Sequence, residues 1–204
     1  MLKLYCAPRT ISVAVVTLLN DAGIHWEPIR VDIAGGEQTR PEYHRINPKG
    51  RVPVLITPEG ALTEAGAILE YLAETAVPGY VPADPLARAR MREVMFYLAS
   101  TMHVNHAHKM RGRRWANDEA ALADMTAKVP ETMAASCAYV EALMTGPFLF
   151  GPNLTLADFY LFTICTWLAG DGVDVSKFPR LSAFMATMEQ TCGVRQARAD
   201  GFFG

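Results

Sequence analysis

Apolar and polar positions in the first eighty residues alternate between short strand-like runs and longer helix-like stripes. Short apolar or alternating runs predict strands, and stripes that recur every three to four residues predict helices. The expected strands are Leu2–Tyr5, Trp26–Ile33, Val52–Ile56 and Ala61-Leu62. The expected helices are Ile11–Leu19, a helical turn at Pro41–Ile46, and a helix opening at Thr63-Glu64 and running to Leu72. The element order is therefore β-α-β-α-β-β-α.

The rest of the chain carries only helical signals after a proline-rich stretch. Residues 77–85 (VPGYVPADP) have the composition of a linker between domains. Helices are expected at Leu86 to about Trp115, Asp118–Met144, Thr155–Leu168 and Lys177–Thr191. Thr155 and Asp158 have the spacing of a capping box at a helix start. We therefore expect an α/β domain over 1–76 and an all-helical domain over 86–204.

The composition of the chain limits the partners that it could bind and the cellular compartment in which we expect it. Lys plus Arg (19) nearly balance Asp plus Glu (21), so no global field would recruit nucleic acid or an anionic membrane. The four cysteines lie far apart without a CxxC pair, as expected for reduced thiols in a cytosol. No apolar run reaches the length of a signal peptide or a membrane span. We expect a cytoplasmic protein.

The segment Asn47-Pro-Lys-Gly-Arg-Val-Pro-Val-Leu55 is the most specific in the sequence. A proline inside a strand removes a ladder donor, so it marks an edge or a turn. We expect the Val52-Pro53 bond to be cis, because X–Pro bonds tolerate that form. Such a strand end would offer the Val52 backbone to an extended peptide-like ligand. The alternative is an edge-strand proline without a ligand.

This segment, followed nine residues on by Glu64-Ala-Gly-Ala-Ile-Leu-Glu-Tyr-Leu72, resembles the glutathione transferase family. The resemblance extends over most of the chain: the strand and helix order, the proline-rich linker, the helical second half, and the Thr155–Asp158 box. It is nearest to the bacterial beta-like and theta-like branches. It implies a thioredoxin-like α/β N-terminal domain, an all-α C-terminal domain, and glutathione as co-substrate. It also implies a homodimer, for which the apolar residues of Met91–Met102 give further support.

The family's glutathione-binding roles carry over to five positions of this sequence. The resemblance implies that Arg51 meets the glycyl carboxylate, that Val52 beside Pro53 bonds the cysteinyl backbone, and that Glu64 accepts the α-ammonium group. Ala65 departs from the family's usual serine, which leaves only a backbone N–H for the γ-glutamyl carboxylate. The alternatives are a solvated strand-end charge for Arg51 and a carboxylate favoured by the helix dipole for Glu64.

The residue that stabilises the glutathione thiolate is expected near the start of the first helix. By alignment on the first strand and Gly23, Ile11 stands where beta-like members carry a cysteine, and Ser12 where they often carry a serine. We take Ser12 as the first catalytic candidate and Thr10 as the second, because a hydroxyl and free N–H groups suit a thiolate. The alternative for both is helix capping. Cys6 is expected to be a buried small residue.

Three of the five histidines cluster at His103, His106 and His108. The first two are three residues apart, on one helix face, whereas His108 points elsewhere. No Cys or acid at metal spacing accompanies them, so no metal site is expected. In the family this helix borders the active-site cleft, which implies that His103, His106 and Arg111 contact the second substrate. The alternative is a polar helix face at a dimer or domain interface.

The leading hypothesis is an enzyme that conjugates the glutathione thiolate to a small hydrophobic electrophile. No metal, nucleotide or flavin is implied, because the sequence has no GxGxxG, P-loop or HExxH motif. Two alternatives are kept: a non-catalytic glutathione-binding or scaffold protein of the same fold, and a glutathione-dependent thiol reductase or peroxidase. The missing CxxC pair counts against the second.

Overall fold

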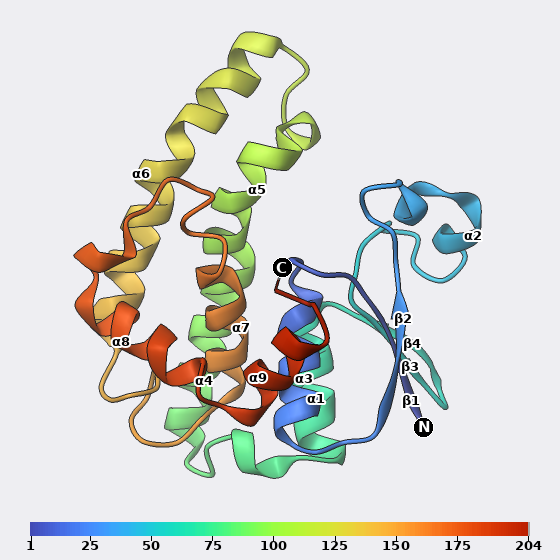
Figure 1. Cartoon of the computed structure of the whole chain (residues 1–204), viewed down its shortest axis with the longest axis vertical. Coiled ribbons are helices and arrows are strands. Elements are labelled where there is room, and N and C mark those ends of the chain that lie inside the picture. Colours follow the sequence, from blue (N-terminus) through green and yellow to red (C-terminus); the bar gives the residue numbers. More distant parts are fainter. Residues whose placement is uncertain (204) are drawn as a thin grey trace. The chain divides into compact units, whose positions relative to one another are not determined.

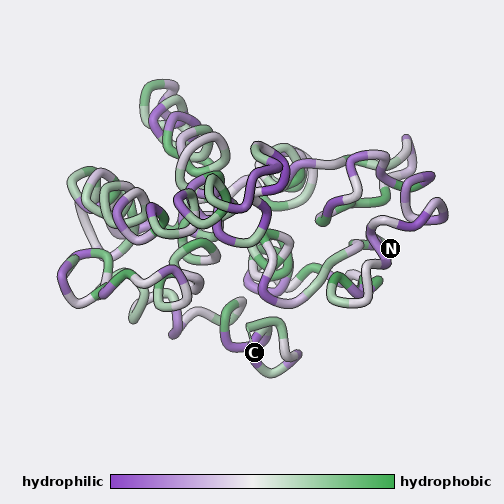
Figure 2. Tube along the Cα trace, turned by 90° about the horizontal axis from the view of Figure 1, so that it is seen from above, coloured by the Kyte–Doolittle hydropathy of each residue, from purple (hydrophilic) through white to green (hydrophobic). Residues whose placement is uncertain are grey.

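The computed structural model describes residues 1–203, which divide into two compact units. The first unit contains Met1–Val81 together with the chain from Met188 onward, and the second contains Pro82–Thr187. Hydrophobic and hydrophilic stretches alternate along the helices of each unit, as expected for helices with one buried face (Figure 2). None of the helices in these residues combines the length and the apolar composition that a membrane crossing needs.

A four-stranded mixed sheet forms the frame of the first unit, in the order β2-β1-β3-β4. Its strands are β1 (Leu2–Cys6), β2 (Trp26–Arg30), β3 (Val54–Thr57) and β4 (Gly60–Thr63). β1 runs parallel to β2 and antiparallel to β3, and β3 and β4 form a hairpin. β2 is shorter than expected, because the Ile33 N–H turns back onto the Val31 carbonyl at 3.0 Å.

Helices α1 (Ser12–Asp21), α3 (Ala65–Thr75) and α9 (Cys192–Ala199) pack together beside this sheet (Figure 1). α1 is apolar at most positions, and all residues from Ser12 to Leu19 are buried in it. The short α2 (Pro41–His44) contributes Tyr43 to a separate apolar cluster with Val52 and Val54. The first unit therefore has two apolar layers around its sheet.

The chain from Met188 onward packs on the first unit, although the sequence placed it in the helical domain over 86–204. α9 was not predicted either, because it is short and mostly polar: only Val194 and Ala197 supply an apolar stripe. Gly193 lies so close to α1 that a Cβ would stand 2.2 Å from the Thr17 carbonyl oxygen. The absence of a side chain there permits the close packing of α9 on α1.

The second unit is a bundle around one wholly buried helix. Its helices are α4 (Pro85–Tyr97), α5 (His103–Arg111), α6 (Glu119–Leu143), α7 (Leu156–Cys165) and α8 (Pro179–Met188), whose last residue joins the first unit. A π-helical turn, Leu98–Met102, links α4 to α5, and α5 and α6 form a long hairpin (Figure 1). Every residue of α7 is buried, which places this helix at the centre of the bundle.

The capping box expected at Thr155 is present at the start of α7. The Asp158 carboxylate accepts the Thr155 N–H at 2.7 Å and, from the preceding loop, the Leu149 N–H at 2.8 Å. Burial raises the pKa of Asp158, and these hydrogen bonds act in the opposite direction. The carboxylate thus holds the entry loop against the central helix.

Candidate active site

Strand register brings the sequence-predicted site residues of the first unit to one edge of the sheet. Tyr5 pairs with Val54, and Val54 pairs with Thr63, in two antiparallel ladders. The end of β1, the start of β3 and the end of β4 therefore lie side by side. Thr10 and Ser12 follow β1, Arg51 to Pro53 precede β3, and Glu64 follows β4. Helices α1 and α3 both begin at this edge. The first N–H groups of α1 are bonded to Thr10 and Ile11, so the free helix-start N–H groups in the described part of this edge belong to α3.

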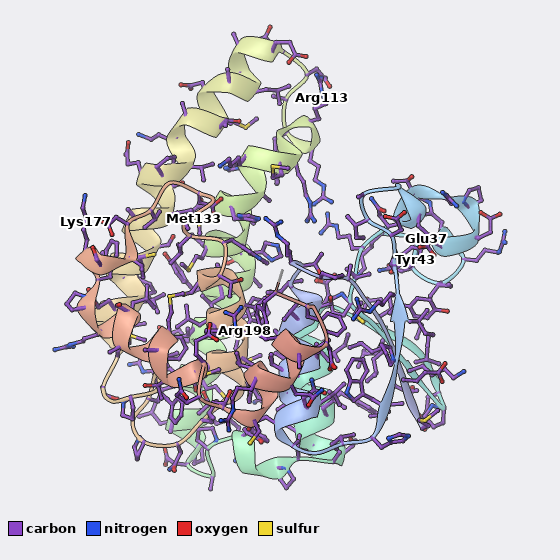
Figure 3. The ribbon with its side chains drawn as sticks, viewed as in Figure 1. Glu37, Tyr43, Arg113, Met133, Lys177 and Arg198 are labelled. Carbon is purple, nitrogen blue, oxygen red and sulfur yellow. The ribbon has the colours of Figure 1, made fainter. Side chains whose placement is uncertain are left out.

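The turn before β3 is fixed by buried polar side chains. The Arg51 carbonyl accepts the Tyr43 hydroxyl at 2.8 Å and the Asn47 side-chain amide at 2.7 Å. Tyr43, labelled in Figure 3, is buried, and burial raises the pKa of its phenol. Gly50 has φ +60°, and a Cβ there would lie 2.9 Å from the Gln38 carbonyl oxygen. The turn therefore requires glycine and a buried amide.

The Val52-Pro53 bond is cis, as the sequence predicts. Both residues are buried, whereas the Arg51 side chain is exposed. Within residues 1–203 the Val52 N–H and carbonyl have no hydrogen-bond partner. β-Pairing resumes only at Val54. The backbone of Val52 is thus available to pair with an extended ligand.

Glu64 connects β4 to α3 in a backbone conformation that residues other than glycine rarely adopt. Its φ is +72°, while its side chain is exposed and forms an ion pair with Lys49. Lys49 also donates to the Thr63 hydroxyl at 2.8 Å. A non-glycine residue at positive φ costs about 1–3 kcal/mol and occurs often at functional sites. Ala65 follows, buried, as the first residue of α3.

The hydroxyl groups of Thr10 and Ser12 form one hydrogen-bond network at the start of α1. Their oxygens are 2.7 Å apart, and each lies within hydrogen-bond distance of the Ala7 carbonyl, at 2.8 Å from Thr10 and 3.1 Å from Ser12. Ser12 also accepts the Ala7 N–H at 3.0 Å and is 0% exposed, whereas Thr10 is partly exposed. Three contacts share two hydroxyl protons, so the Thr10 proton can be released to a ligand while Ser12 serves Ala7.

Cys6 lies at the end of β1 and is fully buried, as expected from the sequence. Burial raises the pKa of its thiol to about 12, against a smaller lowering by Arg30. A thiol with that pKa is protonated and unreactive near neutral pH.

In the helical unit the predicted histidines gather around one buried indole. The His106 ring stacks on Trp167 with centroids 4.3 Å apart, and the His103 ring lies 5.2 Å from Trp167. The His106 Nδ1 is 2.8 Å from a carboxylate oxygen of Asp171, whose side chain is 1% exposed. An Nδ1–H bonded to a carboxylate fixes the ring and leaves Nε2 on its other side.

The two remaining cluster residues take other positions. His108 meets Trp115 edge-on, with centroids 4.7 Å apart, in agreement with its expected separate direction. Arg111, at the last position of α5, is partly exposed. Over residues 1–203, no three His, Cys, Asp or Glu side chains are grouped as a metal site would require.

Sequence reasoning missed Lys49, Asn47 and Asp171 as parts of these arrangements. Asn47 belongs to the Asn-Pro turn, so its buried amide could have been inferred as a turn clamp. Lys49 and Asp171 carry no local signal, because their partners lie 15 and 65 positions away.

Together these features define a class: a two-unit protein whose sheet edge offers an unpaired strand backbone, a carboxylate and a helix start to a peptide-like ligand. Residues 1–74 match the family model of the glutathione S-transferase N-terminal domain, and residues 73–191 match that of the C-terminal domain. The chain belongs to the glutathione S-transferase family.

Relatives and solved structures agree with this family over most or all of the chain. Glutathione S-transferase GST-4.5 of Xanthomonas campestris is 29% identical, over 98% of this chain and 99% of that protein. A maleylacetoacetate isomerase of Pseudomonas aeruginosa is 32% identical, over 88% and 87%. The structure of a glutathione transferase homologue from Sulfitobacter with bound glutathione superposes with a TM-score of 0.97 and 50% identity, covering 100% of this chain and 99% of that one.

These similarities confirm the sequence-based family, the thioredoxin-like α/β plus all-helical fold, and an enzyme of the glutathione transferase kind. Glutathione binding is a property of this family and of the solved relatives. Membership of the family does not by itself specify the reaction, because the relatives include both transferases and isomerases.

Proposed function

We propose that this enzyme conjugates the glutathione thiolate to a small hydrophobic electrophile. The observation that carries the proposal is the sheet edge where the unpaired Val52 backbone, the Glu64 carboxylate and the hydroxyl pair of Thr10 and Ser12 meet. In the reaction the sulfur forms a bond to an electrophilic carbon, the bond from that carbon to its leaving group breaks and the group departs as an anion such as halide, and the thiol proton leaves to solvent. The protein contributes ionisation of the thiol and proximity of the two reactants.

Glutathione recognition is assigned to the same five residues that the sequence singled out. Val52, beside Pro53, pairs its free backbone groups with the cysteinyl unit, and Glu64 accepts the α-ammonium group. The N–H groups at the start of α3, from Ala65 on, receive the γ-glutamyl carboxylate. Arg51 directly precedes Val52 in the sequence, and its exposed guanidinium is assigned to the glycyl carboxylate.

For the thiolate we propose Thr10 as the hydrogen-bond donor and Ser12 as the residue that positions it. This reverses the order expected from the sequence. Partial exposure of Thr10 and complete burial of Ser12 support the change. When Thr10 donates to sulfur, the Ser12 hydroxyl can donate to the Thr10 oxygen or to the Ala7 carbonyl. Ser12 therefore keeps the network satisfied in both states.

For the second substrate we retain His103, His106 and Arg111 of the helical unit as the proposed contacting residues. His106 is held by Asp171 and Trp167, so its free ring nitrogen is fixed in direction. We also retain a homodimer and a cytoplasmic location as proposals. Phe96 and Leu86 on α4 are 73% and 68% exposed, which supports an apolar dimer surface.

A second candidate reaction is glutathione-dependent cis–trans isomerisation of a maleyl compound. The Pseudomonas relative named as a maleylacetoacetate isomerase favours it, because its similarity spans most of both chains. In that reaction the thiolate adds to the double bond and leaves again, so glutathione is not consumed. The ionised thiol is common to both reactions, and the fate of glutathione separates them.

The test measures glutathione binding first and turnover second. Wild type should be retained on immobilised glutathione, and Glu64→Gln should bind roughly two- to fivefold more weakly, as for one exposed ion pair. Conjugation is then followed with an aryl halide, and isomerisation with a maleyl acid. Consumption of glutathione supports the transferase, and isomerisation without consumption supports the second candidate. Glutathione binding without conjugation or isomerisation would support the non-catalytic scaffold protein. Glutathione-dependent reduction of a disulfide or peroxide would support the reductase or peroxidase.

A further inference from the structure

The loop that carries Thr10 is bonded to a segment almost two hundred residues away. Arg9 has φ +59°, a left-handed conformation that a side chain disfavours. Its N–H donates to the Phe202 carbonyl at 2.9 Å. We propose that residues 192–203, here called the α9 segment, position the thiolate loop (residues 7–12) by holding Arg9 in this conformation. The inference rests on the proposed function of Thr10.

The α9 segment is attached to α1 at the end opposite to the loop. The Gly193 N–H donates to the Asp21 carboxylate at 3.0 Å, and Gly193 touches the backbone near Thr17. Asp21 is the last residue of α1, whereas Arg9 lies three residues before its first. The segment therefore follows the length of α1 and ends at the thiolate loop. Its position is fixed by the most buried helix of the first unit.

A second set of contacts holds the segment at the loop end. The Phe202 ring is buried, the Arg30 guanidinium lies 4.6 Å from its centroid, and the Trp26 ring lies 6.4 Å away. Arg30 also donates to the Asp200 carbonyl. β2, to which Trp26 and Arg30 belong, is thus joined to the α9 segment through both a ring and a carbonyl.

Loss of the hydrogen bond between the Arg9 N–H and the Phe202 carbonyl would move Thr10, because Arg9 directly precedes it in the chain. Without the Phe202 carbonyl, Arg9 can relax to a negative φ, and the chain direction into Thr10 changes. A displacement of about 1 Å at a reacting group can cost on the order of a hundredfold in rate. Phe202 is therefore a positioning residue, with Arg30 as its support. Neither is proposed to contact glutathione.

The test compares two arginines that each stack on a phenylalanine of this segment. Arg30→Gln removes the support of Phe202. Arg198→Gln is the matched control, because Arg198 (Figure 3) lies 4.8 Å from the ring of Phe203, not Phe202, and pairs with the side chain of Glu189. Readouts are hydrogen exchange of the Arg9 amide, kcat, glutathione Kd, and the pKa of bound glutathione from the ultraviolet absorbance of its thiolate.

Arg30→Gln should speed exchange of the Arg9 amide by about tenfold, as for a local opening. It should also lower kcat by roughly three- to tenfold and raise the thiol pKa, with Kd within about twofold of wild type. Arg198→Gln should match wild type in all four. Phe202→Leu, which keeps an apolar core residue but removes the ring, should behave like Arg30→Gln.

Faster Arg9 exchange with unchanged kcat and thiol pKa would overturn the positioning role. Equal behaviour of Arg30→Gln and Arg198→Gln in a folded protein would overturn it as well. Failure of the proposed function looks different, because wild type itself would then bind no glutathione or form no bound thiolate.

Discussion

The hydroxyl pair at the start of α1 offers the sharpest separation between a catalytic and a structural role. Thr10→Val keeps the shape of the side chain and removes the hydroxyl proposed to donate to the thiolate. A hydrogen bond to a charged group contributes about 1.5–3 kcal/mol. Its loss predicts a rate lower by roughly ten- to hundredfold. The pKa of the bound thiol should rise by about one to two units.

For Ser12→Ala we expect the opposite result: a larger loss of stability than of catalytic rate. Ser12 is fully buried and accepts the Ala7 N–H, so its removal leaves a buried donor without a partner. That costs about 1–3 kcal/mol of the free energy of unfolding. Thr10→Val leaves the Ala7 N–H bonded to Ser12. The N–H that loses its acceptor is that of Ser12, whose contact to the Thr10 hydroxyl is long, at 3.3 Å, and only partly buried. Its cost in stability should be only about 1 kcal/mol.

Three measurements on both variants decide between the roles: urea unfolding, kcat, and absorbance titration of the bound thiolate. The expected result is a large thiol pKa change with Thr10→Val and a large stability change with Ser12→Ala. If Ser12→Ala raised the thiol pKa as much as Thr10→Val and left unfolding unchanged, Ser12 would be the donor. If neither variant changed the thiol pKa, the stabilisation would come from backbone N–H groups instead.

Three further predictions follow from other parts of the chain. Asp158→Ala should lower the free energy of unfolding by on the order of 3 kcal/mol, because two buried N–H groups lose their acceptor; a urea midpoint equal to that of wild type would contradict this. Alkylation of the native protein at about pH 8 should modify the exposed Cys192 and spare Cys6, because burial raises the pKa of Cys6 to about 12. Mass spectrometry of the peptides measures this, and modification of Cys6 as early as Cys192 would contradict the prediction. Light scattering should report a dimer that Phe96→Glu weakens, and a monomeric wild type at micromolar concentration would refute the dimer.

Much of the fold could be predicted because it depends on local patterns. The strand and helix order of the first unit, the cis Val52-Pro53 bond and the Thr155–Asp158 capping box each lie within a few residues of their signal. The helix boundaries were less accurate: Thr63 lies in β4, and α3 begins only at Ala65. There the backbone of Glu64 turns between the two elements.

What could not be predicted depends on contacts between distant positions. Ser and Thr near a helix start look alike in sequence, and only the packed structure shows that Ser12 is buried while Thr10 is partly exposed. The bond from Arg9 to Phe202 and the pair of His106 with Asp171 leave no periodic pattern. Such contacts arise from tertiary packing, which hydrophobic periodicity does not encode.

The central claim is that this chain binds glutathione and ionises its thiol, and proton release on binding tests it most directly. A free thiol with a pKa of about 8.5 is almost wholly protonated at about pH 7. Isothermal titration of glutathione into the enzyme, repeated in buffers of different ionisation enthalpy, counts the protons released. We predict release of most of one proton per site, and a clearly smaller release from Thr10→Val. Binding without proton release, or no binding, would contradict the account.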